Sequence, residues 1–221
     1  TAEEDGEWLH EQALRNEVTF LDGIGFAPGI SNITVGEGIR KLDRARSAVA
    51  RVGGIPEKAA AARHPLRYMV TWAFDHVLRE YMIKVQVKKN GRVVEVDALT
   101  DRETFPFRQF GVNETLECAI TPGMPSFIYT RPELGDFAEK TVRWPGHYAA
   151  VDVLRECGLL DLDPVRLDRM AVVPREFLAR LLTPRLQPRP GERDVCVMWN
   201  TVLGTKAGRQ ARVDYYLWDE A

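Results

Sequence analysis

Residues 85–99 read VQVKKNGRVVEVDAL, and they carry the strongest local signal for the fold. Two runs in which apolar and polar residues alternate meet at Asn90-Gly91. Alternation with a period of two is typical of a strand that has one buried face. Asn-Gly accepts the positive φ angles that a tight hairpin turn needs at both central positions. The stretch therefore predicts a β-hairpin from Lys84 to Leu99.

The regions on either side of this hairpin supply further strands and helices. We expect strands over residues 18–21, 48–52, 115–120, 195–204 and 211–219, with KAGRQ joining the last two as a second hairpin. We expect helices over residues 7–15 and 33–45, from His147 to a cap at Gly158, and from Pro174 onward. Residues 56–65 suggest a mobile loop or a short solvated helix, the pattern after Leu66 turns toward strand, and residues 121–133 suggest a loop with an apolar tip. The predicted class is α+β, with a mixed, largely antiparallel sheet covered by helices on one face.

Composition excludes several classes of function. The chain has 221 residues, of which 45% are hydrophobic and 28% charged, with a formal net charge of −2. Charges of both signs are interspersed, so nucleic acid is not an expected partner. The apolar runs are too short to span a membrane and the N-terminus is acidic, which predicts a cytoplasmic protein. Three widely spaced cysteines without a CxxC pair indicate reduced thiols rather than a disulfide framework or a metal site.

A glycine-rich loop invites a dinucleotide-binding interpretation that its spacing does not support. Gly23, Gly25 and Gly29 follow a predicted strand, and Asp43 stands where a ribose-binding acid would be sought. The fingerprint requires its third glycine one residue earlier, where this chain has Pro28. We interpret the segment as a strand-loop-helix turn, with the shaping of a substrate pocket as its alternative role. The sequence contains no self-contained catalytic motif, so the catalytic residues stay unknown.

Three stretches in order along the chain resemble the saccharopine dehydrogenase family, which includes lysine 6-dehydrogenase and carboxynorspermidine dehydrogenase. They are VTFLDGIGFAPGISN (residues 18–32), VGGIP (52–56) followed by HPLRYMVTWAFDHVLREY (64–81), and EKTVRWPGHYAAVDVLRECGLLD (139–161). The hairpin of residues 84–99 lies between the second and the third. Together these stretches cover most of residues 17–165.

The resemblance implies a domain organisation. Full-length members carry an N-terminal Rossmann domain that holds NAD or NADP, and residues 1–22 resemble the end of that domain. Residues 23–221 would then be the substrate-binding and dimerisation domain, truncated at its C-terminal end. Such a fragment would bind no dinucleotide, would form a homodimer and would be inactive alone. The full-length enzyme would transfer hydride between NAD(P) and the carbon that bears an amine of an amino acid or polyamine-type substrate.

The resemblance also points to site residues, each with a structural alternative. Arg143 would bind a substrate carboxylate beside the Trp144-Pro145-Gly146-His147 turn, or Arg143 and His147 would fix that turn through backbone hydrogen bonds. Asn32 would donate to substrate or cap a helix. Trp72 would line the pocket or fill the core.

The remaining site residues bear on closure and specificity. Tyr129 and Thr130 would close over the substrate or contact a partner subunit. Where saccharopine-forming members have an arginine after the tryptophan, this chain has Asp75, which suits an amine and favours a lysine or polyamine-type substrate. The alternative function is a non-catalytic binding or interaction module that retains the domain fold.

Overall fold

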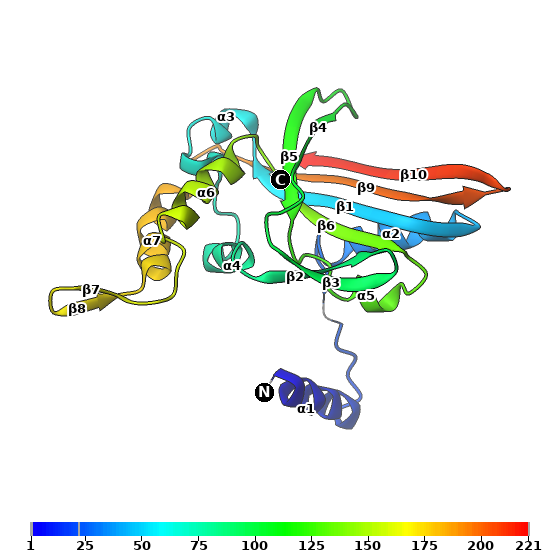
Figure 1. The fold of residues 1–221 in the computed structure, drawn as a ribbon, viewed down its shortest axis with the longest axis horizontal. Coiled ribbons are helices and arrows are strands. Elements are labelled where there is room, and N and C mark those ends of the chain that lie inside the picture. The colour runs from blue at the N-terminus through cyan, green and yellow to red at the C-terminus, as the bar shows by residue number, and fades with distance from the viewer. Residues whose placement is uncertain (1, 22, 221) are drawn as a thin grey trace.

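The fold centres on an eight-stranded sheet, shown in Figure 1, in a computed structural model that describes residues 2–21 and 23–220. The strand order is β10-β9-β1-β6-β2-β3, and β5 also pairs with β6 and carries β4. The strands of this sheet are β1 (Arg44–Pro56), β2 (Lys84–Lys89), β3 (Arg92–Asp97), β4 (Glu103–Phe107), β5 (Glu114–Ile120), β6 (Asp136–Arg143), β9 (Asp194–Lys206) and β10 (Arg209–Glu220). A separate small hairpin pairs β7 (Val165–Leu167) with β8 (Met170–Val172).

The helices gather in two places around the sheet. They are α1 (Ala2–Arg15), α2 (Ile30–Arg40), α3 (Lys58–Ala61), α4 (Phe74–Glu80), α5 (Phe127–Thr130), α6 (His147–Glu156) and α7 (Pro174–Leu182), with 3-10 turns η1 (Pro65–Arg67) and η2 (Thr183–Arg185). In Figure 1, α2 lies behind the long strands, α3, α6 and α7 gather beyond one end of the sheet, and α1 lies apart. None of the helices within the described residues is long and apolar enough to cross a membrane.

The predicted class, a mixed and largely antiparallel sheet in an α+β fold, is confirmed. β1 pairs in parallel with β6, whereas the other pairings in this sheet are antiparallel. The hairpin of residues 84–99 forms as predicted, with φ angles of 52° at Asn90 and 76° at Gly91. The C-terminal hairpin turns at Ala207-Gly208, where φ is also positive at both residues.

Helix α2 covers one face of the long strands. Val35 of α2 is fully buried in a cluster with Ala48 of β1 and Val202 of β9. Gly38 allows the close approach, because a Cβ there would lie 2.8 Å from Cγ2 of Val202. A second cluster packs α4, α6 and α7 around Tyr81 and Tyr148. The sheet is therefore supported by helices over one face and at one end.

Several predicted elements differ from the structure. The helix predicted over residues 33–45 spans Ile30–Arg40, and β1 runs from Arg44 to Pro56 rather than over residues 48–52. Residues 18–21 are not a strand, and the region after Leu66 leads into helix α4 rather than a strand. The strand at residues 18–21 was predicted from its apolar run, but among the described residues no neighbouring strand pairs with it.

Two segments predicted as loops contain helices, and four strands of the structure were not predicted. Residues 56–65 contain helix α3, whose Ala60 and Ala61 are buried rather than solvated. Residues 121–133 contain helix α5, with Phe127 and Ile128 buried. Strands β4, β6, β7 and β8 were not predicted. β6 escapes the pattern because three of its four charged residues, Glu139, Lys140 and Arg143, are buried, which reverses the usual relation between polarity and exposure.

Candidate functional site

A cavity of about 390 Å³ lies where β1, β6 and β9 meet α4 and the loop that precedes α2. Its wall combines one guanidinium group, three carboxyl groups, a tryptophan and two adjacent glycines. The lining residues are Phe26, Ala27, Val52, Gly53, Gly54, Thr71, Trp72, Glu80, Gly123, Glu139, Thr141, Arg143, Asp194 and Cys196. Concave sites with a few convergent polar groups are the usual place for small molecules.

Alternation along β6 brings the polar residues to the cavity. Glu139, Thr141 and Arg143 stand at every second position, so their side chains leave the same face of the sheet. β1 runs beside them with Val52 opposite Thr141. Gly53 has no room for a side chain, because a Cβ there would lie 2.5 Å from the carbonyl oxygen of Val142. The close pairing of β1 and β6 therefore requires glycine at this position.

Arg143 is held rigidly in the cavity wall. Its Nε donates to the hydroxyl oxygen of Tyr81 at 3.1 Å, and its Nη1 donates to the carbonyl oxygens of Gly54 and Val142. The guanidinium also stands 5.2 Å from the ring centroid of Tyr68. Within the described residues no hydrogen bond uses Nη2. A fixed, permanently charged guanidinium with an unused nitrogen is suited to bind a carboxylate.

His147 supports Arg143 from behind and does not line the cavity. Its Nδ1 lies 2.8 Å from the carbonyl oxygen of Leu66, and its Nε2 lies 3.0 Å from the hydroxyl oxygen of Tyr81. Burial, reinforced by the charge of Arg143, lowers the pKa of His147 to about 3, so the ring is neutral. Nδ1 must then carry the proton that it donates to Leu66, and Nε2 accepts from Tyr81. The chain of hydrogen bonds fixes the orientation of Arg143.

Glu139 and Glu80 are cavity residues that the sequence interpretation missed. Oε2 of Glu139 accepts from Oγ1 of Thr121 at 2.7 Å and from the backbone N of Gly123 at 2.9 Å. Burial raises the pKa of Glu139 to about 8 and is also the main cause that raises the pKa of Glu80. The available signal was the spacing of Glu139 and Arg143, which lie four residues apart with Thr141 between them.

The other predicted site residues divide between the cavity and its surroundings. Trp72 lines the cavity and is 48% exposed, so it does not fill the core. Asn32 caps α2, where its Oδ1 accepts from the backbone N of Gly29. Asp75 is exposed in the first turn of α4 and lies outside the lining residues. Tyr129 is exposed and donates to Gln86, and Thr130 donates to the carbonyl oxygen of Ser126.

The glycine-rich loop before α2 shapes the cavity, and the backbone donors at the junction with the helix are largely used within the loop. Phe26 and Ala27 at its tip line the cavity. Gly29 has a φ of 138°, and a Cβ there would lie 1.9 Å from the carbonyl oxygen of Gly25. A pyrophosphate needs unpaired N–H groups at the start of the helix. The backbone N–H groups of Ile30 and Ser31 instead donate to loop carbonyl oxygens, and that of Gly29 donates to Asn32.

Metal chemistry has no obvious centre in the described part of the chain. No group of three or more His, Cys, Asp or Glu side chains within those residues is arranged to hold a metal ion. Cys118 is buried, Cys157 exposed and Cys196 intermediate, and all three are free thiols. Burial raises the pKa of both Cys118 and Cys196, which makes these two thiols poor nucleophiles.

Comparison with known proteins gives the class to which this fold and cavity belong. Residues 25–221 match the family described as saccharopine dehydrogenase C-terminal domain. The chain therefore belongs to the saccharopine dehydrogenase C-terminal domain family.

Individual relatives are considerably longer than this chain. An alpha-aminoadipic semialdehyde synthase of Arabidopsis thaliana is 29% identical over 164 residues, which cover 69% of this chain and 15% of the relative. A saccharopine dehydrogenase [NADP(+), L-glutamate-forming] of Schizosaccharomyces pombe is 24% identical over 161 residues, covering 69% of this chain and 35% of the relative. The fold is similar to that of apo saccharopine dehydrogenase (L-Glu forming) from Saccharomyces cerevisiae, with a TM-score of 0.70 and 18% identity, covering 89% of this chain and 59% of that chain.

Proposed function

We propose that this chain is the substrate-binding and dimerisation domain of an NAD(P)-dependent oxidoreductase that acts on the C–N bond of an amino acid or polyamine-type substrate. The observation that carries the proposal is the cavity in which buried Arg143 shares a wall with Glu80 and Glu139. Membership of the saccharopine dehydrogenase C-terminal domain family supports the reaction class. A guanidinium and carboxyl groups in one cavity suit a ligand that carries both a carboxylate and an amine.

The distance between Arg143 and Glu139 supports a substrate that carries its carboxylate and its amine at opposite ends. Arg143 lies four residues beyond Glu139 on β6, so their Cα atoms are roughly 13 Å apart at the usual rise of a strand. In this proposal Arg143 binds the carboxylate, Glu139 faces the amine and Trp72 supplies an apolar part of the wall. Asp75, from which the sequence predicted an amine substrate, lies outside the lining residues, whereas Glu80 near the end of the same helix lines the cavity.

The cofactor would be held outside these 221 residues. At the start of α2 the backbone N–H groups of Gly29, Ile30 and Ser31 already donate within the loop, and the glycine spacing departs from the dinucleotide fingerprint. Residues 1–22 are proposed to belong with a Rossmann domain. This part of the proposal is supported by the exposed apolar side chains of α1 and the segment after it, namely Trp8, Leu9, Leu14, Val18, Phe20 and Leu21. Such side chains in sequence indicate a surface that another domain covers.

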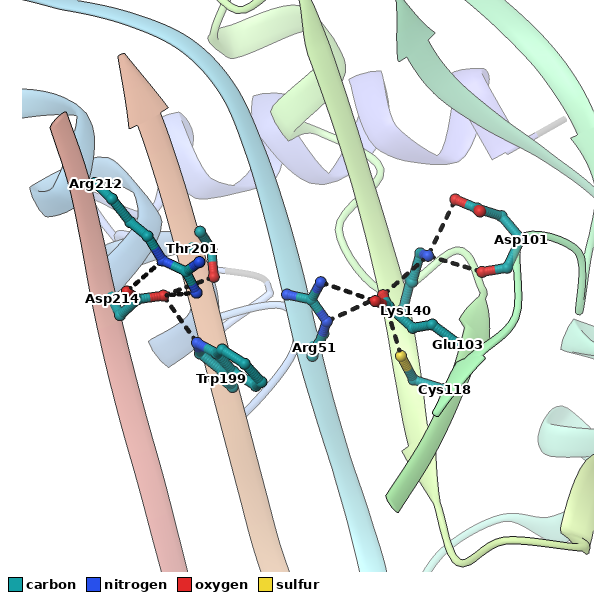
Figure 2. Close-up of polar contacts among 9 residues, drawn as sticks. All are labelled: Arg51, Asp101, Glu103, Cys118, Lys140, Trp199, Thr201, Arg212 and Asp214. Carbon is teal, nitrogen blue, oxygen red and sulfur yellow. Dashed lines mark hydrogen bonds and ion pairs between the residues drawn. The ribbon is translucent and has the colours of Figure 1, made fainter. Parts of the chain in front are cut away.

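A homodimer is proposed across the face of the sheet that lies opposite α2. Figure 2 shows polar contacts on this face: Glu103 binds Arg51 and Lys140, and Asp214 binds Trp199, Thr201 and Arg212. The charges are neutralised within the face, while Trp199 and Tyr216 stack with ring centroids 5.4 Å apart and stay partly exposed. Aromatic and arginine side chains are enriched in protein interfaces. Sedimentation that finds a monomer at micromolar concentration would refute the dimer.

The activity is tested on the full-length protein. It is incubated with NAD+ or NADP+ and with saccharopine, lysine or a polyamine, and formation of the reduced nicotinamide is followed by absorbance. We expect reduction with at least one of these amines and a raised KM for carboxylate-bearing substrates in Arg143→Lys, because Lys cannot form the same bidentate contact. If substrates bind and no cofactor is reduced, the domain is a non-catalytic binding module.

A further inference from the structure

We propose that Glu139 is the group that accepts the proton of the substrate amine, a role that rests on the oxidoreductase function proposed above. Glu139 is 4% exposed and lines the same cavity as Arg143. Its carboxyl group accepts hydrogen bonds from a hydroxyl and a backbone amide, and among the described residues no basic side chain is bonded to it. A buried carboxyl group without a counter-charge is costly and is therefore a signal of function.

The local geometry holds one oxygen of Glu139 and leaves the other available. Thr121 and the backbone N of Gly123 both donate to Oε2. Within the described residues no hydrogen bond goes to Oε1. Gly123 is needed for this contact, because a Cβ on it would lie 2.7 Å from Cδ of Glu139. The carboxyl group is thus oriented before the substrate arrives, which is the condition for efficient proton transfer.

Glu80 is less suited to the same role. It lies at the end of α4, is only partly buried, and makes no hydrogen bond among the described residues that would fix its carboxyl group. Its negative charge raises the pKa of Glu139, whereas Arg143 and the two hydrogen bonds lower it, and burial is the largest cause of all. Asp194 and Cys196 of β9 also line this cavity. Lys84 and Glu139 both line an adjoining cavity, where the Lys84 ammonium is paired with Asp97.

The balance of these effects places the titration of Glu139 where a general base is most effective. With a pKa of about 8, the carboxyl group both takes up and releases a proton near neutral pH. A substrate amine enters as an ammonium ion, and its charge favours the carboxylate form of Glu139. One N–H bond of the ammonium then breaks, an O–H bond forms on Glu139, and the electron pair stays on nitrogen. The neutral amine is the form whose lone pair assists loss of hydride from the adjacent carbon.

The test compares Glu139→Gln with Glu95→Gln in the full-length protein. Glu95 is an exposed residue of β3 and serves as the matched control. We expect Glu139→Gln to lose 100-fold or more in kcat/KM, on the order of what general-base catalysis contributes. We expect the activity of the wild-type protein to rise with pH as Glu139 loses its proton. This rise should be absent from Glu139→Gln. Glu139→Asp should restore part of the activity, since it restores a carboxylate at a longer distance.

A second readout does not depend on turnover. Calorimetric titration with the amine substrate at pH 7, in two buffers with different ionisation enthalpies, reports protons exchanged on binding. On binding the substrate, the wild-type protein should release close to one proton, because the ammonium group displaces the proton of the Glu139 carboxyl group. Glu139→Gln should release none. Unchanged kcat/KM and an unchanged pH profile in a folded Glu139→Gln variant would overturn the proposal. If wild type oxidises no amine, the oxidoreductase function fails, and calorimetry alone then decides whether Glu139 exchanges a proton with the ligand.

Discussion

Replacing Tyr81 with phenylalanine should destabilise the domain far more than the loss of one hydroxyl group at the surface. Tyr81 is 3% exposed, and its oxygen joins Nε of Arg143 at 3.1 Å to Nε2 of His147 at 3.0 Å. Tyr81→Phe leaves a buried imidazole acceptor and a buried guanidinium donor without partners. Each such group costs about 1 to 3 kcal/mol. We therefore expect a loss of about 2 to 6 kcal/mol in the free energy of unfolding.

Tyr129→Phe is the matched control, because it removes the same atom from a side chain that is 65% exposed and donates only to Gln86. Substitutions at such surface positions usually change stability by less than about 0.5 kcal/mol. Urea unfolding of the 221-residue chain, followed by circular dichroism, measures both variants. The midpoint of Tyr81→Phe should fall clearly below that of Tyr129→Phe with a similar slope. Equal midpoints would show that water or rearrangement satisfies Arg143 and His147, and the proposed support of the cavity would be wrong.

Three further predictions concern Glu139, the β1–β6 contact and the glycine-rich loop. The pKa of Glu139 rises from 4.5 in the unfolded chain to about 8, so the folded state retains a proton that the unfolded state has lost, and its stability falls between these pH values. Glu139→Gln should remove this pH-dependent loss of stability, which is at most on the order of 5 kcal/mol. The prediction is contradicted if the unfolding curves of the wild type and of Glu139→Gln shift equally between pH 5 and pH 9. Gly53→Ala should cost about 1 to 3 kcal/mol in urea unfolding because of the clash with Val142, whereas Gly6→Ala, with open space around it, should not destabilise. Finally, NADH and NADPH should show no enhanced fluorescence with this chain, and tight binding would reverse our interpretation of the loop.

The local patterns of the sequence were enough to predict the hairpins and the class of fold. Asn90-Gly91 and Ala207-Gly208 each lie between alternating runs, so turn chemistry and strand pattern agree. The helix that begins at His147 also follows its pattern, and Gly158 takes a positive φ of 71° just beyond its end. These elements depend on turn residues, on the alternation along a strand and on helix caps, all of which are visible in neighbouring residues of one sequence.

The candidate site was harder to predict, and the reason is physical. Glu139 and Arg143 alternate on a strand whose buried face is polar, so the usual pattern for a strand is absent. Their neighbour Glu80 comes from helix α4, in a region where the local pattern after Leu66 indicated a strand. Trp72 and Arg143, which were predicted, do share the cavity. His147, Asn32, Asp75, Tyr129 and Thr130 lie outside its lining, because a sequence alone does not show which loops meet in space.

The most direct test of the cavity as the substrate site uses the tryptophan indoles as local reporters. The full-length protein is labelled with ¹⁵N at tryptophan, and its spectrum is recorded while it is saturated with an amine that it oxidises. Trp72 lines the cavity, whereas Trp144 is buried, with its indole N–H bonded to Pro56, and Trp199 lies on the open face of the sheet. We predict that the indole signal of Trp72 moves and those of Trp144 and Trp199 do not. A shift at Trp199 with none at Trp72 would place the substrate elsewhere and contradict the account.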